Sequence, residues 1–449
     1  MKATTESITR LAGSSRGRLI CRHFTERSCV DTLIVGGGPV GLSTAFHLSQ
    51  LRKSGNGITV LERDPSYRSS SAMMSAGGIR HQFSVRENVE MSLYGRDFLR
   101  NAEKLLATSS HPIVDVNFVE HGYLFLTSSS TGENQMVENQ KVQLTAGCKN
   151  TKLLTRDEIA KLFPWLNVSD ILMGSYGISG EGWFDPWSLV QGLKEKSKEA
   201  GVQYLHATVV GASRDPDSGH VLSVEVKDLT TGRTKSFLPQ NLVNAAGAQA
   251  DALMTLLAGV DQPLQQPIPV KPRKRCIFSF HCSPSQDEIV PDIVPLTIDT
   301  SLVYFRSEGK TGSGNFICGV SPPIEQDADC WDSRDLEHAD YFLFEEIIWP
   351  ALYHRVPAFG SIKVRSSWAG LYEYNTIDQN AIIDFHPEMG NVLMVNGFSG
   401  HGLQHSPASG RAAAELLENS NKFVTLDLNV FRFDRFVRGG SPIYEKGIV

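Results

Sequence analysis

A glycine-rich turn near the start of the chain restricts the fold more than any other feature. Residues 31–35, DTLIV, are a short apolar run that suits a buried parallel strand. The sequence GGGPVG follows at 36–41, and residues 42–48 continue with the apolar spacing of a helix. A second strand-like run, 58–61, ends at Glu62, about 20 residues after the last of these glycines. This order of strand, G-x-G-x-x-G turn, helix and acidic strand end predicts a Rossmann-type unit that binds a dinucleotide.

Each part of the turn has a physical role in this interpretation. Gly36 allows the tight turn, Gly38 leaves room for a pyrophosphate, and Gly41 lets the helix pack closely on the sheet. The pyrophosphate is expected at the helix N-terminus, where unpaired N–H groups favour an anion. The pattern alone does not distinguish FAD from NAD. The nucleotide-binding positions predicted in this unit are Gly36, Gly38, Pro39, Val40, Gly41, Glu62 and Arg63.

Two later segments predict further parts of an α/β domain. Asp185, followed by a proline, is a good N-cap for a helix over 186–201, and a strand is expected over 203–210. Residues 241–247, NLVNAAG, read as a strand that ends in small residues. Small residues at a strand end allow a ligand to approach the backbone closely.

A third segment, 392–403, combines a strand with a glycine-rich turn. A helix is predicted to follow over 407–417. Its N-terminus would present N–H groups that favour negative charge, such as that on a reduced isoalloxazine. The alternative is an unrelated loop that happens to contain three glycines.

Together these segments resemble the D-amino-acid-oxidase/sarcosine-oxidase superfamily of FAD-dependent amine oxidoreductases. The motifs are the N-terminal fingerprint, SAGGIR at 75–80, NAAG at 244–247 and GFSGHG at 397–402, and the match extends from 31 to about 417. The resemblance implies that the cofactor is FAD and that the last motif lies against the flavin. It adds Ser75, Gly77, Gly78, Val209, Ala246, Gly247, Gly397, Phe398, Ser399, Gly400, His401, Gly402 and Leu403 to the expected FAD-binding positions.

The resemblance also implies the architecture. An α/β fold is expected, in which a Rossmann-like FAD-binding domain carries a second, antiparallel-sheet substrate domain, with substrate bound between the two. Both domains would be discontinuous in sequence. The expected ranges are 31–90, 176–268 and 385–425 for the FAD-binding domain, 91–175 and 269–384 for the substrate domain, and 426–449 for a C-terminal tail.

The superfamily oxidises amines that carry an α-carboxylate, which basic side chains hold. Arg80 matches such an arginine, and its planar fork suits bidentate binding of a carboxylate; the alternative is a surface salt bridge. Sarcosine oxidases have a second, lysine contact where this chain has the neutral Gln404. Tyr372 and Tyr374 are further candidates on the substrate side, although tyrosines that alternate along a strand also suit one packed face.

Other departures bear on the cofactor. Members that attach FAD covalently use a cysteine where this chain has Leu371 or a histidine where it has Met74. We therefore expect non-covalent FAD. The oxygen-activating lysine of the oxidases falls near Ile317, and the nearest lysine, Lys310, lies several residues away. This difference favours a dehydrogenase over an oxidase.

Four longer segments resemble a mitochondrial group within the superfamily that is implicated in assembly of respiratory complex I. They are FPW at 163–165, EGWFDPW at 181–187, PRKR at 272–275 and WAGLYEYNTIDQN at 368–380. The resemblance implies complex I subunits or assembly intermediates as partners and a place in the matrix, peripheral to the inner membrane. Whether the chain acts as an enzyme or as an assembly factor with structural FAD stays open at this point.

The first 30 residues agree with a mitochondrial address. Residues 1–30 are basic, rich in Ser and Thr and poor in acids, which is the composition of a transit peptide; the alternative is a plain disordered tail. The whole chain has a net charge of −6, so no nucleic-acid partner is expected. No run of about 18 apolar residues predicts a membrane span.

The seven cysteines give no sign of a disulfide framework or of a metal site. None forms a C-x-x-C pair, so the ligand spacing of a zinc ribbon or a thioredoxin motif is absent. Their odd number in a long chain favours a reducing compartment. From the sequence, no metal is expected.

Overall fold

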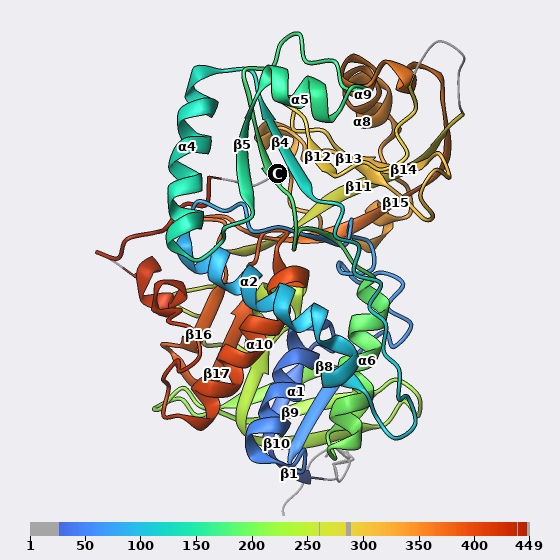
Figure 1. Cartoon of the computed structure of the whole chain (residues 1–449). Coiled ribbons are helices and arrows are strands. Elements are labelled where there is room, and N and C mark those ends of the chain that lie inside the picture. The colour runs from blue at the N-terminus through green and yellow to red at the C-terminus, as the bar shows by residue number, and fades with distance from the viewer. Residues whose placement is uncertain (1–26, 260, 284–288, 438, 447–449) are drawn as a thin grey trace, which may run out of the picture.

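Two sheets organise the molecule, one in each half (Figure 1). The computed structural model describes residues 27–259, 261–283, 289–437 and 439–446. The lower half in Figure 1 contains both the first strands and the last long helix of the chain, so each half is assembled from distant segments. This arrangement confirms the expected α/β fold with a second, largely antiparallel sheet.

The first sheet has seven strands and a parallel centre. Strand β1 pairs in parallel with both β2 and β10, and β10 pairs in parallel with β17, while β8, β9 and β10 form an antiparallel meander. Parallel strands require crossover connections, and the helices supply them. The strands, in sheet order, are β1 (Arg27–Val35), β2 (Ile58–Glu62), β8 (Gln203–Arg214), β9 (Val221–Asp228), β10 (Thr234–Asn244), β17 (Met389–Asn396) and β16 (Ile382–His386).

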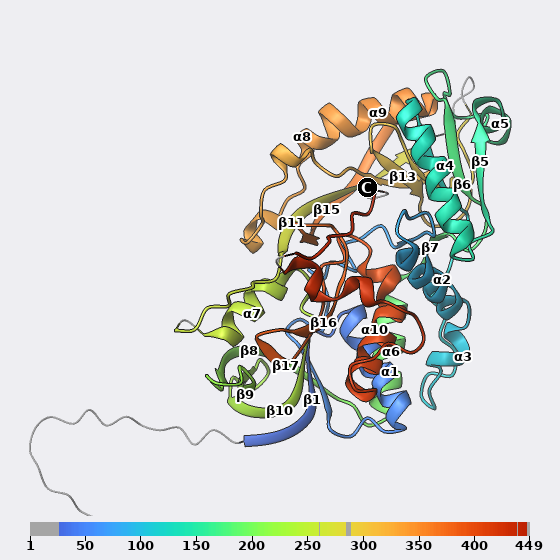
Figure 2. The same ribbon diagram turned by 90° about the vertical axis from the view of Figure 1, so that its left-hand side faces the viewer.

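Helices cover this sheet and bury its apolar residues. Figure 2 shows α1 (Pro39–Arg52), α6 (Pro186–Glu199) and α10 (Gly402–Glu418) side by side. Helix α2 (Arg86–Arg100) packs on α10, and the short α3 (Ala102–Leu106) follows it. The core of this layer includes residues of α1, α6, α10 and the strands beneath them. A separate apolar cluster packs α7 (Ala250–Ala258), which follows the short η1 (Gly247–Gln249), against the meander.

The second sheet has eight strands and forms the roof of the molecule. Its neighbours are antiparallel except for β12 and β4, which pair in parallel. In sheet order the strands are β15 (Ile362–Asn375), β11 (Val270–Cys282), β14 (Asn315–Gly319), β13 (Tyr304–Ser307), β12 (Leu296–Ile298), β4 (Tyr123–Thr127), β6 (Met173–Gly177) and β5 (Thr151–Thr155). A small third sheet pairs β3 (Gly78–Ile79) with β7 (Gly182–Trp183).

Helices pack against the outer side of the roof. Its core joins strand residues such as Phe278 and Phe316 to Ile159 and Leu352 of the helices. These helices thus bury the outer face of the sheet. The inner face lines the space between the two halves. The helical elements that contact this core are α5 (Arg156–Leu162), α8 (Tyr341–Leu343), a π-helical turn (Phe344–Ile348) and α9 (Trp349–Arg355). Helix α4 (Ser130–Thr145) instead contacts β5, β6 and α2.

The predicted N-cap of α6 is present. The side chain of Asp185 accepts hydrogen bonds from the backbone N–H groups of Trp187 and Ser188, and Pro186 begins the helix.

The start predicted for α10 was wrong, because the helix begins at Gly402 and contains Pro407. Proline leaves the carbonyl of Leu403 without its helical N–H donor, and the hydroxyl of Ser406 donates to that carbonyl instead. A side-chain donor therefore lets the helix continue through the proline.

Two expected boundaries differ from the structure, and the expected tail makes specific contacts. Strand β1 begins at Arg27 and not at 31; the rest of the predicted transit peptide, 1–26, lies outside the described residues. Most of helix α2 falls in the range expected for the substrate domain, which began at residue 91. The helix instead packs on α10, in the half that contains the first sheet. Part of the expected tail is packed, because the buried carboxylate of Glu445 accepts N–H bonds from Ser84 and Val85. No helix among the described residues has the length and apolar character needed to cross a membrane.

Candidate functional site

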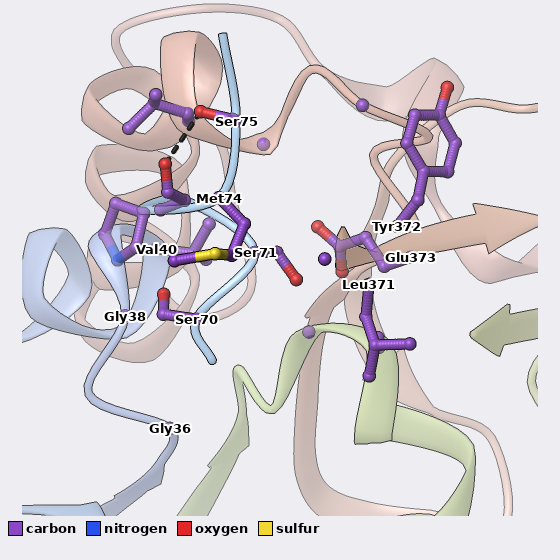
Figure 3. A pocket seen from close by; sticks show the side chains of 18 of the residues that line it. Gly36, Gly38, Val40, Ser70, Ser71, Met74, Ser75, Leu371, Tyr372 and Glu373 are labelled. Atoms are coloured by element: carbon purple, nitrogen blue, oxygen red, sulfur yellow. Dashed lines mark hydrogen bonds between the residues drawn. The ribbon is translucent and has the colours of Figure 1, made fainter. Parts of the chain in front are cut away.

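A long cavity of about 500 Å³ lies between the two halves. Its volume falls in the range of small-molecule and cofactor pockets. Figure 3 shows Val40, Ser70, Ser71, Met74 and Ser75 on one side, with Leu371, Tyr372 and Glu373 of β15 across from them. The cavity thus begins at the glycine-rich turn and extends under the roof.

The glycine-rich turn leaves an open space at its centre. A Cβ placed on Gly38 would meet no atom within 4 Å, although Gly38 lines the cavity at the N-terminus of α1. Gly36 has a positive φ of 109°, and a Cβ there would lie 2.2 Å from the carbonyl oxygen of Ala245. Gly41 does not line the cavity; a Cβ there would lie 1.9 Å from the oxygen of Gly36, so the first turn of α1 packs closely on the strand end. The turn therefore provides a space for a ligand above a closely packed base.

The carboxylate of Glu62 is fixed at the end of β2. Its two oxygens accept hydrogen bonds from the backbone N–H groups of Gly37 and Asp64, each 2.8 Å long. Glu62 and Arg63 both line the cavity, as a role at the ribose of a nucleotide requires. These contacts hold the acid beside the turn.

Most of the other predicted cofactor positions meet at the same cavity, and some do not. Phe398 is buried in the core, and the Ser399 hydroxyl accepts the N–H of Asn375, so both have structural roles. Gly397 also lies outside the lining. The cavity is lined by Gly36, Gly38, Pro39, Val40, Glu62, Arg63, Ser75, Gly77, Gly78, Val209, Ala246, Gly247, Gly400, His401, Gly402 and Leu403 of the predicted set.

Arg80 is buried, with an exposed fraction of 3%, and lines the cavity. One guanidinium nitrogen lies 2.9 Å from Nε2 of His401, and the other donates to the carbonyl of Gln82. The guanidinium also stacks over the rings of Phe83 and Phe125. Burial, with the positive charge of Arg80 beside it, holds the pKa of His401 well below its usual range. The imidazole is therefore neutral, so His401 adds no second positive charge beside Arg80.

The other predicted substrate residues divide into two groups. Gln404 and Tyr372 line the cavity, whereas Tyr374 does not. The side-chain oxygen of Gln404 accepts the backbone N–H of Arg80 at 2.8 Å, so Gln404 fixes the position of the arginine. Tyr372 donates to the carbonyl of Ser399. The alternation along β15 therefore does not place both tyrosines at the site.

Several cavity-lining residues of the roof were not predicted from the sequence. Tyr123, Tyr304 and Arg275 line the cavity, and the guanidinium of Arg275 lies 4.5 Å from the ring centre of Tyr372. Arg275 also forms two parallel hydrogen bonds to Asp327, of 2.6 and 2.9 Å. These residues come from three strands of the second sheet, and no local motif marks them. The only signal in the sequence was the basic PRKR segment, which contains Arg275. Its acidic partner, Asp327, lies in a loop that is distant in sequence.

Glu373 places a carboxyl group beside the turn that precedes α10. It accepts the N–H of Gly397 at 3.2 Å, and a Cβ on Gly402 would lie 2.8 Å from its other oxygen. Burial raises the pKa of Glu373 to about 7, although the N–H groups of Gly397 and Phe398 act in the opposite direction. The turn before α10 was expected to favour negative charge through its N–H groups, and this carboxyl group opposes that effect when it is ionised. An anion at this end of the cavity meets a group that is neutral below about pH 7 and negative above it.

We expect Glu373→Gln to change how stability depends on pH. The pKa of Glu373 is higher in the folded state, so its favourable contribution is complete below the unfolded pKa and is lost as the pH rises to about 7. Because glutamine cannot ionise, the variant should gain about 3 kcal/mol in free energy of unfolding at pH 8 relative to the native chain. Urea unfolding of both proteins at pH 5 and pH 8 measures this difference. A gain of equal size at both pH values would contradict the assignment.

Comparisons with known proteins agree with this geometry. A family model described as FAD dependent oxidoreductase matches residues 31–416. FAD-dependent oxidoreductase domain-containing protein 1 of Xenopus laevis is 41% identical over 93% of this chain and 85% of its own length. The Bos taurus protein of that name is 40% identical over 92% and 86%. The solved L-proline dehydrogenase from P. horikoshii superposes with a TM-score of 0.75 at 24% identity, over 93% of this chain and 100% of its own, and shows the shared fold.

The matches confirm FAD as the cofactor and the resemblance on which it was predicted. The cavity fits this group, since Gly38 and Gly247 each border open space in which a Cβ would meet no atom within 4 Å. Glu62 would hold the ribose, and the turn at α1 would hold the pyrophosphate. The flavin would then extend beneath the roof toward Arg80.

FAD is expected to leave the protein when the chain is denatured. Met74 and Leu371, the residues that the superfamily resemblance sets against the nucleophiles of members with covalent FAD, both line the cavity, and neither side chain can form such a bond. Acid precipitation of the purified protein should therefore leave all of its flavin absorbance in the supernatant. Flavin that stays with the pellet, or that runs with the chain on a denaturing gel, would show a covalent link.

Proposed function

Because the chain belongs to the FAD dependent oxidoreductase family, we propose that it oxidises the C–N bond of a small amine that carries an α-carboxylate. The observation that carries this proposal is the position of Arg80, a buried cation that lines the same cavity as the FAD-binding turn. Its guanidinium suits a carboxylate and would orient the amine toward the flavin. Bound FAD supplies the acceptor for the hydride.

The roof residues would complete the substrate side of this site. Tyr123, Tyr304 and Tyr372 line the cavity under the second sheet, where they exclude water and surround a small substrate. Gln404 would hold the backbone at Arg80 in place of the second, lysine contact. No lysine is among the described residues that line the cavity, which supports a dehydrogenase over an oxidase.

Anaerobic mixing with a panel of N-methyl, D- and L-amino acids tests the proposal. At least one member should bleach the visible absorbance of the bound flavin, because hydride transfer reduces it. The same reaction in air should show slow reoxidation by oxygen and fast reoxidation by an artificial acceptor. A flavin that no carboxylated amine reduces would contradict the proposed reaction.

A role in the assembly of respiratory complex I is the second proposed function, in which FAD can be mainly structural. It is supported by the resemblance of the four longer segments to the mitochondrial assembly group and by the neutral Gln404 in place of a lysine. In this role FAD would stabilise the native state by mass action, whatever its redox use. The partners would be complex I subunits or assembly intermediates, met in the matrix at the surface of the inner membrane.

Deletion of the gene tests this second role. Complex I levels on native gels should fall and should recover when the full chain is restored. The composition of residues 1–30 supports import, so a fluorescent protein fused to this segment should enter mitochondria. Normal complex I levels after deletion would contradict the assembly role, and a fusion that stays in the cytosol would contradict the proposed location.

A further inference from the structure

Three segments distant in sequence meet beside Arg80 and bring together a histidine, a cysteine and a glutamate. His81 follows β3, Cys148 lies between α4 and β5, and Glu181 lies directly before β7. One ligand atom from each side chain, an imidazole nitrogen, the thiol sulfur and a carboxylate oxygen, lies within 4.8 Å of the other two. The cluster does not line the FAD cavity, and the proposed reaction does not use it.

The cluster is closed to solvent and contains polar atoms that lack partners. His81 and Glu181 are 0% exposed and Cys148 is 2% exposed. Neither ring nitrogen of His81 has a hydrogen-bond partner of good geometry among the described residues, although Oε1 of Glu181 lies 3.4 Å from Nδ1. Buried polar atoms without partners are costly, and an absent ion is one recognised explanation for them.

We propose that His81, Cys148 and Glu181 bind one zinc ion. Thiolate, imidazole and carboxylate are the three ligand types that Zn²⁺ takes in proteins, and a separation of 3.4 Å between Nδ1 and Oε1 is close to the edge of a zinc tetrahedron. The ligands come from three segments, so no C-x-x-C spacing announces the site in the sequence. Zinc would join the segment that carries Arg80 to two loops of the roof.

The neighbours of the cluster resemble the outer shell of a metal site. The amide of Gln82 donates to Oε2 of Glu181 at 2.8 Å, and the backbone N–H of His81 lies 3.1 Å from Oε1. Gln82 is itself held by the hydroxyl of Ser175, which donates to its side-chain oxygen at 2.6 Å. Outer contacts of this kind orient a ligating carboxylate, and their loss usually weakens metal binding by about 10- to 100-fold. Gln82→Met should therefore weaken zinc binding within that range.

Metal analysis of the full FAD-loaded chain tests the proposal. The protein is stripped of metal with a chelator, incubated with excess ZnCl₂ and freed of unbound metal. Its zinc content is then measured by elemental mass spectrometry. The native chain should retain one zinc per chain, and Cys148→Ser and Glu181→Gln should each lower the affinity by more than about 100-fold. Cys276→Ser is the matched control, because Cys276 is equally buried but outside the cluster, and it should retain the metal.

Cobalt loading keeps the test decisive if a variant fails to fold. Co²⁺ bound to the native chain should give a thiolate-to-cobalt charge-transfer band, which only a cysteine ligand produces, and zinc should displace it. The visible spectrum of the bound FAD reports whether each variant keeps its fold. A native chain that retains neither zinc nor cobalt would overturn the proposal and leave a metal-free hydrogen-bonded triad. A folded Cys148→Ser chain with native zinc content would overturn it as well.

Discussion

Gly38→Val is expected to yield a folded protein that has lost its FAD. Gly38 has φ −71° and ψ −177°, which valine adopts without strain, and a Cβ there meets no protein atom within 4 Å. The added methyl groups would instead occupy the space in front of α1, where the pyrophosphate binds. We expect the affinity for FAD to fall by about 100-fold or more, equivalent to ~3 kcal/mol of binding free energy.

Titration of FAD into the stripped protein, followed by calorimetry, measures this loss. Gly211→Val is the matched control, because Gly211 lies in β8 away from the cavity lining and its Cβ would make ordinary contacts of 3.5 Å with Glu225. The control should bind FAD with native affinity. Native affinity in Gly38→Val would mean that the pyrophosphate does not bind at this turn.

Arg80→Ala should keep FAD and lose most of the reaction with carboxylated amines. Removal of the guanidinium takes away the buried cation that faces the cavity, while the turn at α1 and Glu62 stay unchanged. Truncation of one partner of a buried charge pair costs about 2–4 kcal/mol, so kcat/KM should fall by roughly 30- to 1,000-fold. Arg80→Lys should fall less than this, because lysine keeps the charge but loses the planar fork.

The rate of anaerobic flavin reduction at several substrate concentrations measures the effect. Arg273→Ala provides the matched control, since Arg273 is paired with Asp329 and does not line the cavity. It should react at the native rate. If Arg80→Ala reduced the flavin as well as the native chain does, the carboxylate would have to bind elsewhere in the cavity.

The sequence predicted those parts of the molecule that depend on neighbouring residues. The turn at 36–41, the N-cap Asp185 and the strand-to-helix turn before α10 each contain their own signals, and all are present. The helix predicted from Pro407 was the exception. A proline often marks the first turn of a helix. Here it lies inside the helix, because the hydroxyl of Ser406 donates a hydrogen bond to the carbonyl of Leu403, which the proline cannot do.

The roof of the cavity could not be predicted in this way. Tyr123, Arg275 and Tyr304 lie on three strands that only the long-range pairing of the second sheet brings together. Tyr372 and Tyr374 were both candidates for the substrate side, but only Tyr372 lines the cavity, and the alternation of the two tyrosines could not show where along the strand the cavity lies. The cluster of His81, Cys148 and Glu181 was also not predicted, because its three members are distant in sequence.

Anaerobic reduction by matched amines with and without a carboxylate shows whether the carboxylate decides which amines react. The FAD-loaded chain is mixed with each carboxylated amine of the panel and with the corresponding amine that lacks the carboxyl group. A carboxylated amine should bleach the flavin and its decarboxylated partner should not, because Arg80 has no anion to bind in the second case. Equal reduction by both partners, or by neither across the panel, would rule out carboxylate recognition by Arg80 as the basis of the reaction.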